Sequence, residues 1–577
     1  MEWFSGFTHS IGNRIEVFGL FFFASLFLSL ILTPLSAKFA FLVGAVDQPN
    51  QRSVHNLAMP RLGGLGMAIA LGVSVLFFLP VNSFIAGFLA GLALIVAIGV
   101  ADDILQLKAR YKLVGQIVSI LLFISISGYQ VSSFGDLFGA GEIEFGIFAP
   151  LVTLLCMLAI MNALNLSDGL DGLAGGITAI ATLFLGAMAI RTGSWETLGI
   201  LIALAGAVVG FLRYNSHPAR MFMGDTGSLL LGYVLAASCV SLASGSADSE
   251  EMKSLAPVSV AIVLYLPLFD ALIVMLRRII NKQGAFEADN THLHHYLIDM
   301  GVPHGAVVSV LYFVSFLFGL LALVVINMPE LLQLLISVGA ALAFFATVEI
   351  LKRVDPAGLF NLGASIEKWD QIVLGSIGKL VIRSTGIVAP MLLLALAAPV
   401  VIVNQTLGHW GWLALAFGVV ILASFPWLQR QHHAGLLHGR LYLSIFTLLF
   451  YYHVFGVNSY AWLEEYLFWL SMTALSWAAL RFIARGSTQL YLTTGYEVFL
   501  LLATWGIPVA ILPALTGKQD ADIIQAVYAA CWQTIPLLLV MRAYVCRLPK
   551  HRNFVVLLLV AALFVLGYRY IPDFLIG

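Results

Sequence analysis

Runs of about 20 consecutive apolar residues, separated by short polar segments, recur from one end of the 577-residue chain to the other. A helix needs about 20 such residues to cross the roughly 30 Å hydrocarbon core of a bilayer, because each residue adds about 1.5 Å. Hydrophobic residues make up 60% of the chain and charged residues 10%, against roughly 45–50% and about 25% in soluble domains. The sequence therefore predicts an all-α, polytopic integral membrane protein and excludes a water-soluble globule.

The hydropathy pattern predicts about eighteen transmembrane helices, about eleven in residues 1–350 and about seven in residues 385–577. The predicted spans of the first part are 15–38, 62–80, 83–101, 113–130, 147–163, 173–191, 196–212, 228–245, 257–277, 305–327 and 331–350. Those of the second part are 385–403, 410–427, 441–457, 461–479, 495–514, 523–543 and 554–571. The intervening segment 351–384 mixes polar and apolar residues, so we expect it to be a cytoplasmic linker with amphipathic character.

Basic residues predict the orientation of these spans. With the N-terminus outside, sixteen of the eighteen Lys and Arg residues between Lys38 and Arg383 fall in loops on one face, and only Arg191 and Lys253 fall on the other. Loops rich in Lys and Arg stay in the cytoplasm. We therefore expect the basic face to be cytoplasmic. The net charge of −1 gives no general attraction to nucleic acid.

Five polar segments stand out because charged residues beside membrane helices are costly and call for a reason. All five fall on the face that we predict to be cytoplasmic. They are the loop 47–55 with the PRLGG segment at 60–64, the pair Asp102-Asp103 with Lys112 behind it, NLSDGLDG at 165–172, FMGDTGS at 222–228, and HLHH at 292–295.

This set of residue types indicates a metal and a phosphate ligand. Closely spaced carboxylates repel one another unless a cation lies among them, and oxygen ligands suit Mg²⁺ or Mn²⁺. Mg²⁺ usually takes its remaining ligands from water and substrate phosphates. Glycines within the motifs allow close backbone approach, and helix N-termini favour anions. A simpler explanation exists for each motif alone: Asp102-Asp103 or Asp168 could cap helices, and the histidines could be ordinary loop residues.

In this order, the five segments closely resemble the polyprenyl-phosphate N-acetylhexosamine-1-phosphate transferases, over about residues 15–350. The motifs at 165–172 and 222–228 carry most of the resemblance. The HLHH segment resembles the branch that uses small UDP-N-acetylhexosamines, including the undecaprenyl-phosphate GlcNAc-1-phosphate transferases. The resemblance implies that undecaprenyl phosphate attacks the β-phosphorus of a UDP-sugar such as UDP-GlcNAc, which gives undecaprenyl-diphospho-sugar and UMP and initiates cell-surface polysaccharide synthesis in the bacterial inner membrane.

The resemblance also implies individual roles. Asp225 and Asp171 would be Mg²⁺ ligands, with Asp168 close by, and Mn²⁺ is an alternative metal. Asp102 would deprotonate or orient the lipid phosphate with help from Asp103, and Lys112 would bind that phosphate. The residues implied to line the uridine and metal region are Phe222, Asn162 and Asn165, and those implied to hold the sugar or diphosphate are Arg52, His55, His292, His294 and His295.

Two other kinds of protein stay open at this point. A transporter of a nucleotide sugar or lipid-linked sugar would more often place ionisable groups near the bilayer midplane, whereas the spans before residue 350 are nearly free of charge. A scaffold built on an inactive transferase would not need intact motifs. Residues 385–577 carry none of the five motifs. Their polar residues fit an ordinary membrane interface with an aromatic belt, and a partner-docking or lipid-handling module or a second enzyme also fits this part of the chain. The expected partners are undecaprenyl phosphate, a UDP-N-acetylhexosamine and membrane lipid, and the sequence allows a homodimer.

Overall fold

The computed structural model describes residues 11–48, 58–139, 141–244, 254–281, 292–299, 302 and 304–353, together with Tyr466, Leu467, Leu470 and Thr473. The chain divides into two compact units, and the described residues up to Arg353 belong to the first. Arg52 and His55 lie outside the described residues. So do residues 354–384 of the predicted linker and, apart from the four residues just named, the seven spans predicted in 385–577.

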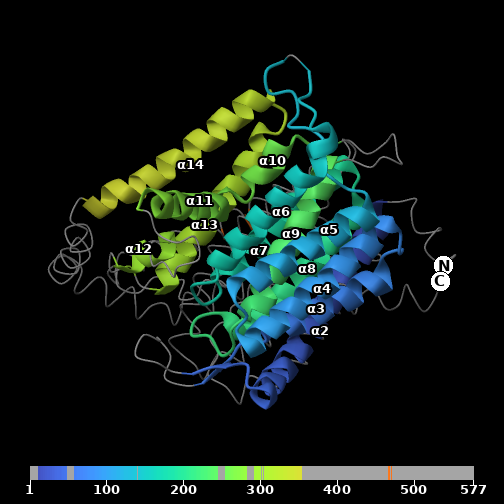
Figure 1. The fold of residues 1–577 in the computed structure, drawn as a ribbon, viewed down its shortest axis with the longest axis vertical. Coiled ribbons are helices and arrows are strands. Elements are labelled where there is room, and N and C mark those ends of the chain that lie inside the picture. Colours follow the sequence, from blue (N-terminus) through green and yellow to red (C-terminus); the bar gives the residue numbers. More distant parts are fainter. Residues whose placement is uncertain are drawn as a thin grey trace. The chain divides into compact units, whose positions relative to one another are not determined.

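The described part of the first unit is a bundle of helices (Figure 1). In chain order these are α2 (Ile11–Val43), α3 (Gly63–Phe78), α4 (Ser83–Leu105), α5 (Ala109–Ser127), α6 (Ala149–Leu166), α7 (Leu173–Thr192), α8 (Trp195–Asn215), α9 (Gly224–Ser244), α10 (Pro257–Ile262), α11 (Tyr265–Ile280), α12 (Leu293–Asp299), α13 (His304–Val325) and α14 (Glu330–Arg353). A 3-10 turn, η2 (Gly146–Phe148), precedes α6, and two short strands, β1 (Val46–Asp47) and β2 (Met59–Pro60), pair antiparallel.

Within the described residues, nine helices are long and apolar enough to cross a membrane. These results confirm the prediction of an all-α polytopic membrane protein for this part of the chain. Each predicted span of residues 1–350 has a helical counterpart, although α3, with 16 residues, is shorter than the predicted span 62–80. The total of about eighteen spans stays a prediction.

One predicted span was wrong as a single element. Residues 257–277 form two helices, α10 and α11, which are separated by a turn at Val263 and Leu264. Pro267 explains the break, because proline has no N–H to donate to the carbonyl of residue 263, and its ring clashes with that carbonyl. Hydropathy cannot detect this break because the apolar run itself is continuous.

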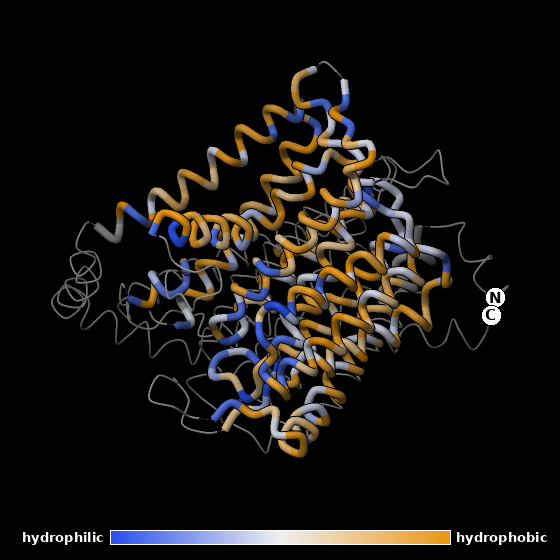
Figure 2. Tube along the Cα trace, viewed as in Figure 1, coloured by the Kyte–Doolittle hydropathy of each residue, from blue (hydrophilic) through white to orange (hydrophobic). Residues whose placement is uncertain are grey.

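Helix α9 lies at the centre of the bundle. It packs against α3, α4, α6, α7 and α8, and it is buried along nearly its whole length, as is α7. The tube coloured by hydropathy shows the helices mostly in the hydrophobic colour, with hydrophilic segments concentrated toward the helix ends (Figure 2). The first turn of α9 therefore brings the FMGDTGS motif to the middle of one end of the bundle.

Glycines allow the helices around that first turn to approach closely. A Cβ atom on Gly64 of α3 would lie 2.1 Å from the backbone nitrogen of Gly227, and one on Gly99 of α4 would lie 2.5 Å from the Cα of Thr226. Both distances are far below van der Waals contact. Only glycine allows α3 and α4 to pack this closely against α9 at these two positions.

The connection before α3 is tied to the same place. The Phe222 N–H donates to the Pro60 carbonyl over 2.9 Å, and the Gly63 and Gly64 N–H groups donate to the carbonyls of Phe222 and Met223 over 3.1 and 2.9 Å. The PRLGG segment thus runs beside the FMGDTGS motif, although about 160 residues separate them in the chain.

Candidate active site

The polar motifs gather at one end of the helical bundle. Asp102 and Asp103 lie at the end of α4, Lys112 in the first turn of α5, the NLSDGLDG motif between α6 and α7, and the FMGDTGS motif at the start of α9. Because α4, α6 and α8 run toward this end and α5, α7 and α9 run away from it, the connections between them meet there (Figure 1). The prediction that these motifs share one face is confirmed for them.

Lys112 is the centre of a charge cluster at this end. Its Nζ lies 2.6 Å from Asp102 Oδ2 and 2.8 Å from Asp225 Oδ1. Asn165 Nδ2 donates to the same Asp225 oxygen over 2.8 Å and to Ser228 Oγ over 2.7 Å. Asp102 is 5% exposed, whereas Lys112 and Asp225 are 22% and 20% exposed. One cation therefore lies between two carboxylates, of which Asp225 is the more accessible to a ligand.

Asp103 has a different environment from its neighbour. Its Oδ1 accepts a hydrogen bond from the Asp225 N–H over 2.8 Å, and its Oδ2 accepts from Thr226 N–H and Thr226 Oγ over 3.0 and 2.6 Å. The free N–H groups of a helix N-terminus favour a carboxylate. Asp103 thus caps α9 from another helix and fixes the backbone that carries Asp225.

Asp168 lies in the α6–α7 loop near the charge cluster. Burial, together with the negative charges of Asp225 and Asp103, raises the pKa of its carboxyl well above the ordinary value, and the positive charge of Arg61 opposes the shift only in part. A carboxyl in this environment favours the protonated form, or a cation beside it. A cation bound at this end of the bundle would therefore also stabilise the ionised form of Asp168.

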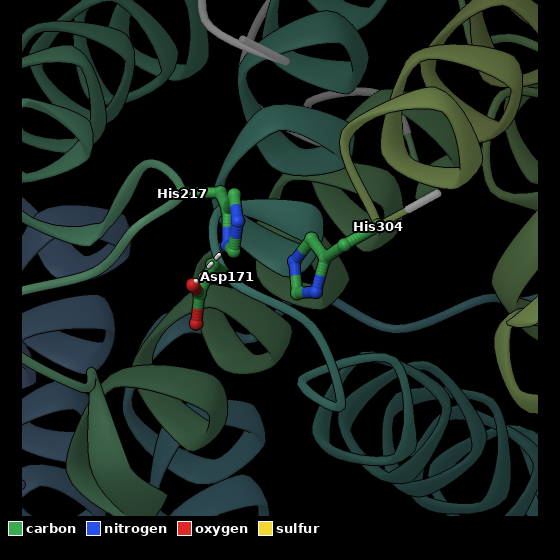
Figure 3. A group of neighbouring side chains, drawn as sticks. All are labelled: Asp171, His217 and His304. Atoms are coloured by element: carbon green, nitrogen blue, oxygen red, sulfur yellow. Dashed lines mark hydrogen bonds and ion pairs between the residues drawn. The ribbon is translucent and has the colours of Figure 1, made fainter. Parts of the chain in front are cut away.

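Asp171 lies at the end of the same loop, beside two histidines (Figure 3). Its Oδ2 is 2.8 Å from His217 Nδ1 and accepts a hydrogen bond from the Ala219 N–H over 3.1 Å. Burial acts to raise the pKa of Asp171, but the hydrogen bonds from His217 and Ala219 outweigh it, so the pKa is lowered. The His304 ring stacks on the His217 ring at a centroid distance of 4.2 Å.

The HLHH segment opens α12 and contacts the α6–α7 loop. Asp270 of α11 holds it, because Asp270 Oδ2 lies 3.0 Å from His292 Nδ1 and Asp270 Oδ1 accepts from the Leu293 N–H over 2.8 Å. His294 packs so closely on Gly169 that a Cβ atom there would lie 2.1 Å from His294 Nε2. Burial and the adjacent His295 lower the pKa of His294 to about 4, so its imidazole is neutral at physiological pH.

The remaining predicted residues occupy defined positions nearby. Phe222 lies in the strand-like contact with the PRLGG segment. Asn162 Nδ2, on an exposed side of α6, donates to the Leu158 carbonyl over 2.8 Å and to Gln116 Oε1 over 3.4 Å. The roles implied for these residues stay predictions.

Three residues of this region were not anticipated: His217, His304 and Asp270. Asp270 carried a signal, since it is an acidic residue inside an otherwise apolar predicted span. His217 precedes the FMGDTGS motif by only five residues, and His304 follows the HLHH segment within one short connection. Sequence spacing alone does not show that these two histidines meet at Asp171.

The oxygen-rich part of the site suits Mg²⁺. Asp102 and Asp225 approach the same ammonium group, so two carboxylates and the Asn165 amide share one small region. Mg²⁺ prefers oxygen ligands, with one or two carboxylates from the protein and the rest from water and phosphate. Asp225, with Asp102 beside it, therefore fits as the protein's contribution to such an ion.

A bundle of apolar helices that presents carboxylates, an amide and a lysine at one end defines a polytopic membrane enzyme suited to phosphate esters at the bilayer surface. Residues 85–243 match glycosyl transferase family 4. The chain is 38% identical over 304 residues to a probable undecaprenyl-phosphate N-acetylglucosaminyl 1-phosphate transferase of Bacillus subtilis, which covers 52% of this chain and 83% of the relative. The chain therefore belongs to glycosyl transferase family 4.

Two further relatives are similar over a comparable length. A decaprenyl-phosphate N-acetylglucosaminephosphotransferase of Mycobacterium tuberculosis is 33% identical over 294 residues, 47% of this chain and 73% of the relative. An undecaprenyl-phosphate alpha-N-acetylglucosaminyl 1-phosphate transferase of Yersinia pestis is 28% identical over 293 residues, 50% of this chain and 77% of the relative. Each of these matches leaves about half of this chain uncovered.

Proposed function

We propose that the protein transfers N-acetylglucosamine 1-phosphate from UDP-GlcNAc to undecaprenyl phosphate, with release of UMP, and so initiates a cell-surface polysaccharide. The names of the three relatives support the transferred group and the polyprenyl phosphate acceptor. The observation that carries the proposal is the contact of Lys112 Nζ with both Asp102 and Asp225 at one end of the bundle. Phosphoryl transfer depends chiefly on positioning and on neutralising charge, and this cluster can do both.

In the proposed reaction, an oxygen of the lipid phosphate forms a bond to the β-phosphorus of the donor, and the bond from that phosphorus to the UMP oxygen breaks. Asp102, buried beside Lys112, would orient the lipid phosphate and accept its proton where one remains. A weak base suffices, because a phosphate monoester loses its second proton near pH 6. Lys112 would exchange part of its contact with the carboxylates for a contact with the incoming phosphate.

Mg²⁺, when bound, would supply positive charge to the diphosphate of the donor. Asp225 would be its principal protein ligand. The hydrogen bond from Asn165 and the capped first turn of α9 would hold the Asp225 carboxylate in position. The second ligand implied by the resemblance, Asp171, contacts His217, and we propose a different task for it below. Mn²⁺ would substitute, since it accepts the same oxygen ligands.

The proposed location is the bacterial inner membrane, with the site on the cytoplasmic face. The distribution of Lys and Arg supports this orientation. It would let a water-soluble nucleotide sugar enter from the cytoplasm while the polyprenyl tail stays in hydrocarbon.

The test uses the full-length protein purified in detergent, with undecaprenyl phosphate and UDP-GlcNAc. We expect release of UMP that needs both substrates and a divalent metal, that stops when the metal is chelated, and that returns with Mg²⁺ or Mn²⁺. Asp225→Asn should lower kcat by at least about 100-fold, in line with the loss of a main electrostatic contact. Asp299→Asn, a matched change at an exposed carboxylate, should not. Uptake of unconverted UDP-GlcNAc into vesicles, without UMP, would favour a transporter instead.

A further inference from the structure

Asp171, His217 and His304 form a cluster that the proposed transfer reaction does not use. They come from three separate places in the chain: the α6–α7 loop, the α8–α9 loop and the first residue of α13. One potential ligand atom from each lies within 4.8 Å of the other two. Among the described residues, no other three or more His, Cys, Asp and Glu side chains converge in this way. Figure 3 shows the three side chains pointing toward one another.

The Asp171–His217 pair lies slightly closer together than two ligands of one ion would. His217 Nδ1 and Asp171 Oδ2 are 2.8 Å apart, whereas two ligands bound at about 2.1 Å are separated by roughly 3.0 to 3.4 Å. The Ala219 N–H also donates to Asp171 Oδ2 over 3.1 Å and so holds the carboxylate in place. Metal ligands are commonly oriented by such secondary hydrogen bonds.

His304 offers a second nitrogen. Its buried Nε2 has no hydrogen-bond partner within the described residues, and its ring stacks on the His217 ring at a centroid distance of 4.2 Å. A buried polar atom without a partner is costly. Nε2 is therefore the atom of His304 that a bound metal ion would satisfy.

The ligand types distinguish this cluster from the oxygen-rich region at Asp225. Two imidazoles and one carboxylate suit Zn²⁺ and related first-row ions, whereas Mg²⁺ prefers oxygen alone. The same set, with a fourth position open to water or substrate, occurs in catalytic zinc sites. His217 is 40% exposed and Asp171 is 18% exposed, so solvent or a phosphate oxygen can reach that fourth position.

We propose that Asp171, His217 and His304 bind a Zn²⁺-class ion, separate from the Mg²⁺ at Asp225, with one position left open for water or a phosphate oxygen. On binding, the proton shared between His217 and Asp171 leaves to solvent, and two metal–ligand bonds replace that hydrogen bond. The cluster contracts from its present spread of up to 4.8 Å, and the half-exposed His217 side chain can supply this movement. The proposal stands on the geometry of these three residues and does not depend on the transferase activity.

The test is direct metal binding to the full-length, chelator-stripped protein in detergent, with Co²⁺ as the spectroscopic probe and Zn²⁺ as competitor. With excess Mg²⁺ present to fill the oxygen-rich region at Asp225, we expect one Co²⁺ per chain, visible absorption typical of nitrogen ligation, and displacement of this Co²⁺ by Zn²⁺. His217→Ala and His304→Ala should each weaken Co²⁺ binding by at least about 10-fold, because even the loss of a secondary contact costs this much. Asp225→Asn is the matched control and should leave Co²⁺ binding unchanged.

Three results would overturn the proposal: no bound Co²⁺ in the wild-type protein, absorption without nitrogen ligation, or undiminished binding in both histidine variants. Size-exclusion profiles check that the variants are folded. If either alanine variant fails to fold, the glutamine variant at the same position replaces it, since glutamine keeps the side-chain volume but removes the imidazole. Loss of UMP formation in an otherwise normal Co²⁺ titration would count against the proposed transferase function alone.

Discussion

Asp102 and Asp103 are adjacent in the chain, yet their side chains have different surroundings. Asp102 contacts the Lys112 ammonium through Oδ2 and accepts a hydrogen bond from the Leu107 N–H through Oδ1. Both oxygens of Asp103 are instead occupied by the first turn of α9. The difference follows from the helix geometry, because successive residues of α4 point about 100° apart around the axis. The Asp102-Asp103 motif therefore combines a residue proposed to act in the reaction with a residue that stabilises the fold.

Substitution should separate these two tasks. We expect Asp102→Asn to lower kcat strongly with little change in the apparent melting temperature. Asp103→Ala should lower both activity and stability, the latter by about 2 kcal/mol, because three hydrogen bonds to a charged acceptor are lost and the α9 N-terminus is left uncapped. Thermal unfolding monitored by tryptophan fluorescence measures the difference. Equal stability of the two variants would contradict the capping role.

The neutral His294 makes stability depend on pH. Because burial lowers its pKa from 6.5 to about 4, the unfolded chain binds more protons than the folded chain between these values. His294 thus contributes stability that is complete above about pH 6.5 and is lost as the pH falls toward about 4.

Thermal unfolding over this pH range is the corresponding measurement. We expect the apparent melting temperature to fall on acidification, and to fall less steeply in His294→Gln, which has no imidazole to protonate. Parallel curves for the two proteins would show that His294 does not titrate as its environment predicts.

At the scale of elements, hydropathy located the helices well because the length of an apolar run is a local property of the sequence. It failed at 257–277, where Pro267 breaks the run into α10 and α11 and where Asp270 holds the HLHH segment. The contact between Asp270 and His292 joins residues 22 positions apart on two elements. A hydropathy pattern within one span does not reveal such a contact.

The close approach of α3 to α9 predicts a sharp contrast within one helix. A Cβ atom on Gly64 would meet the backbone of Gly227 at 2.1 Å, whereas one on Gly72 would meet nothing within 4 Å. Gly64→Ala should therefore destabilise the protein by about 1–3 kcal/mol, as overpacking does, and should reduce activity by shifting the first turn of α9. Gly72→Ala should leave both properties near the wild-type values.

Apparent melting temperatures and rates of UMP release, measured side by side, test this contrast. An unaltered Gly64→Ala protein would mean that α3 and α9 do not pack this closely. A Gly72→Ala protein as impaired as Gly64→Ala would mean that the effect comes from helix propensity rather than from contact.

At the scale of the whole molecule, the sequence indicated that Asp102, Asp103, Asp168, Asp171 and Asp225 would meet at one end of the helices. It did not indicate which of these carboxylates would contact Lys112 and which would contact histidines. Lys112 joins Asp102 to Asp225 only because Gly99 lets α4 pack against α9, and Asp171 meets His217 and His304 only through the packing of α7, α8 and α13. Such pairings depend on tertiary packing, which the spacing of motifs in the sequence does not reveal.

The relatives bear on the size of the catalytic unit. They match about half of this chain but 73% to 83% of their own lengths, and all the described site residues precede residue 305. We therefore expect a protein truncated after Arg353 to insert into membranes and to release UMP at a rate comparable to that of the full chain. Loss of activity in a truncated protein that still inserts would show that the C-terminal residues take part in the reaction.

In the proposed reaction, the phosphorus bonded to the sugar moves with the sugar to the lipid. UDP-GlcNAc labelled at the β-phosphate tests this transfer directly, with undecaprenyl phosphate as acceptor and the full-length protein as catalyst. We predict that the label passes into the lipid fraction as undecaprenyl-diphospho-GlcNAc and that the released nucleotide is unlabelled UMP. Label that stays with the nucleotide as UDP, or that remains in unconverted donor, would contradict it.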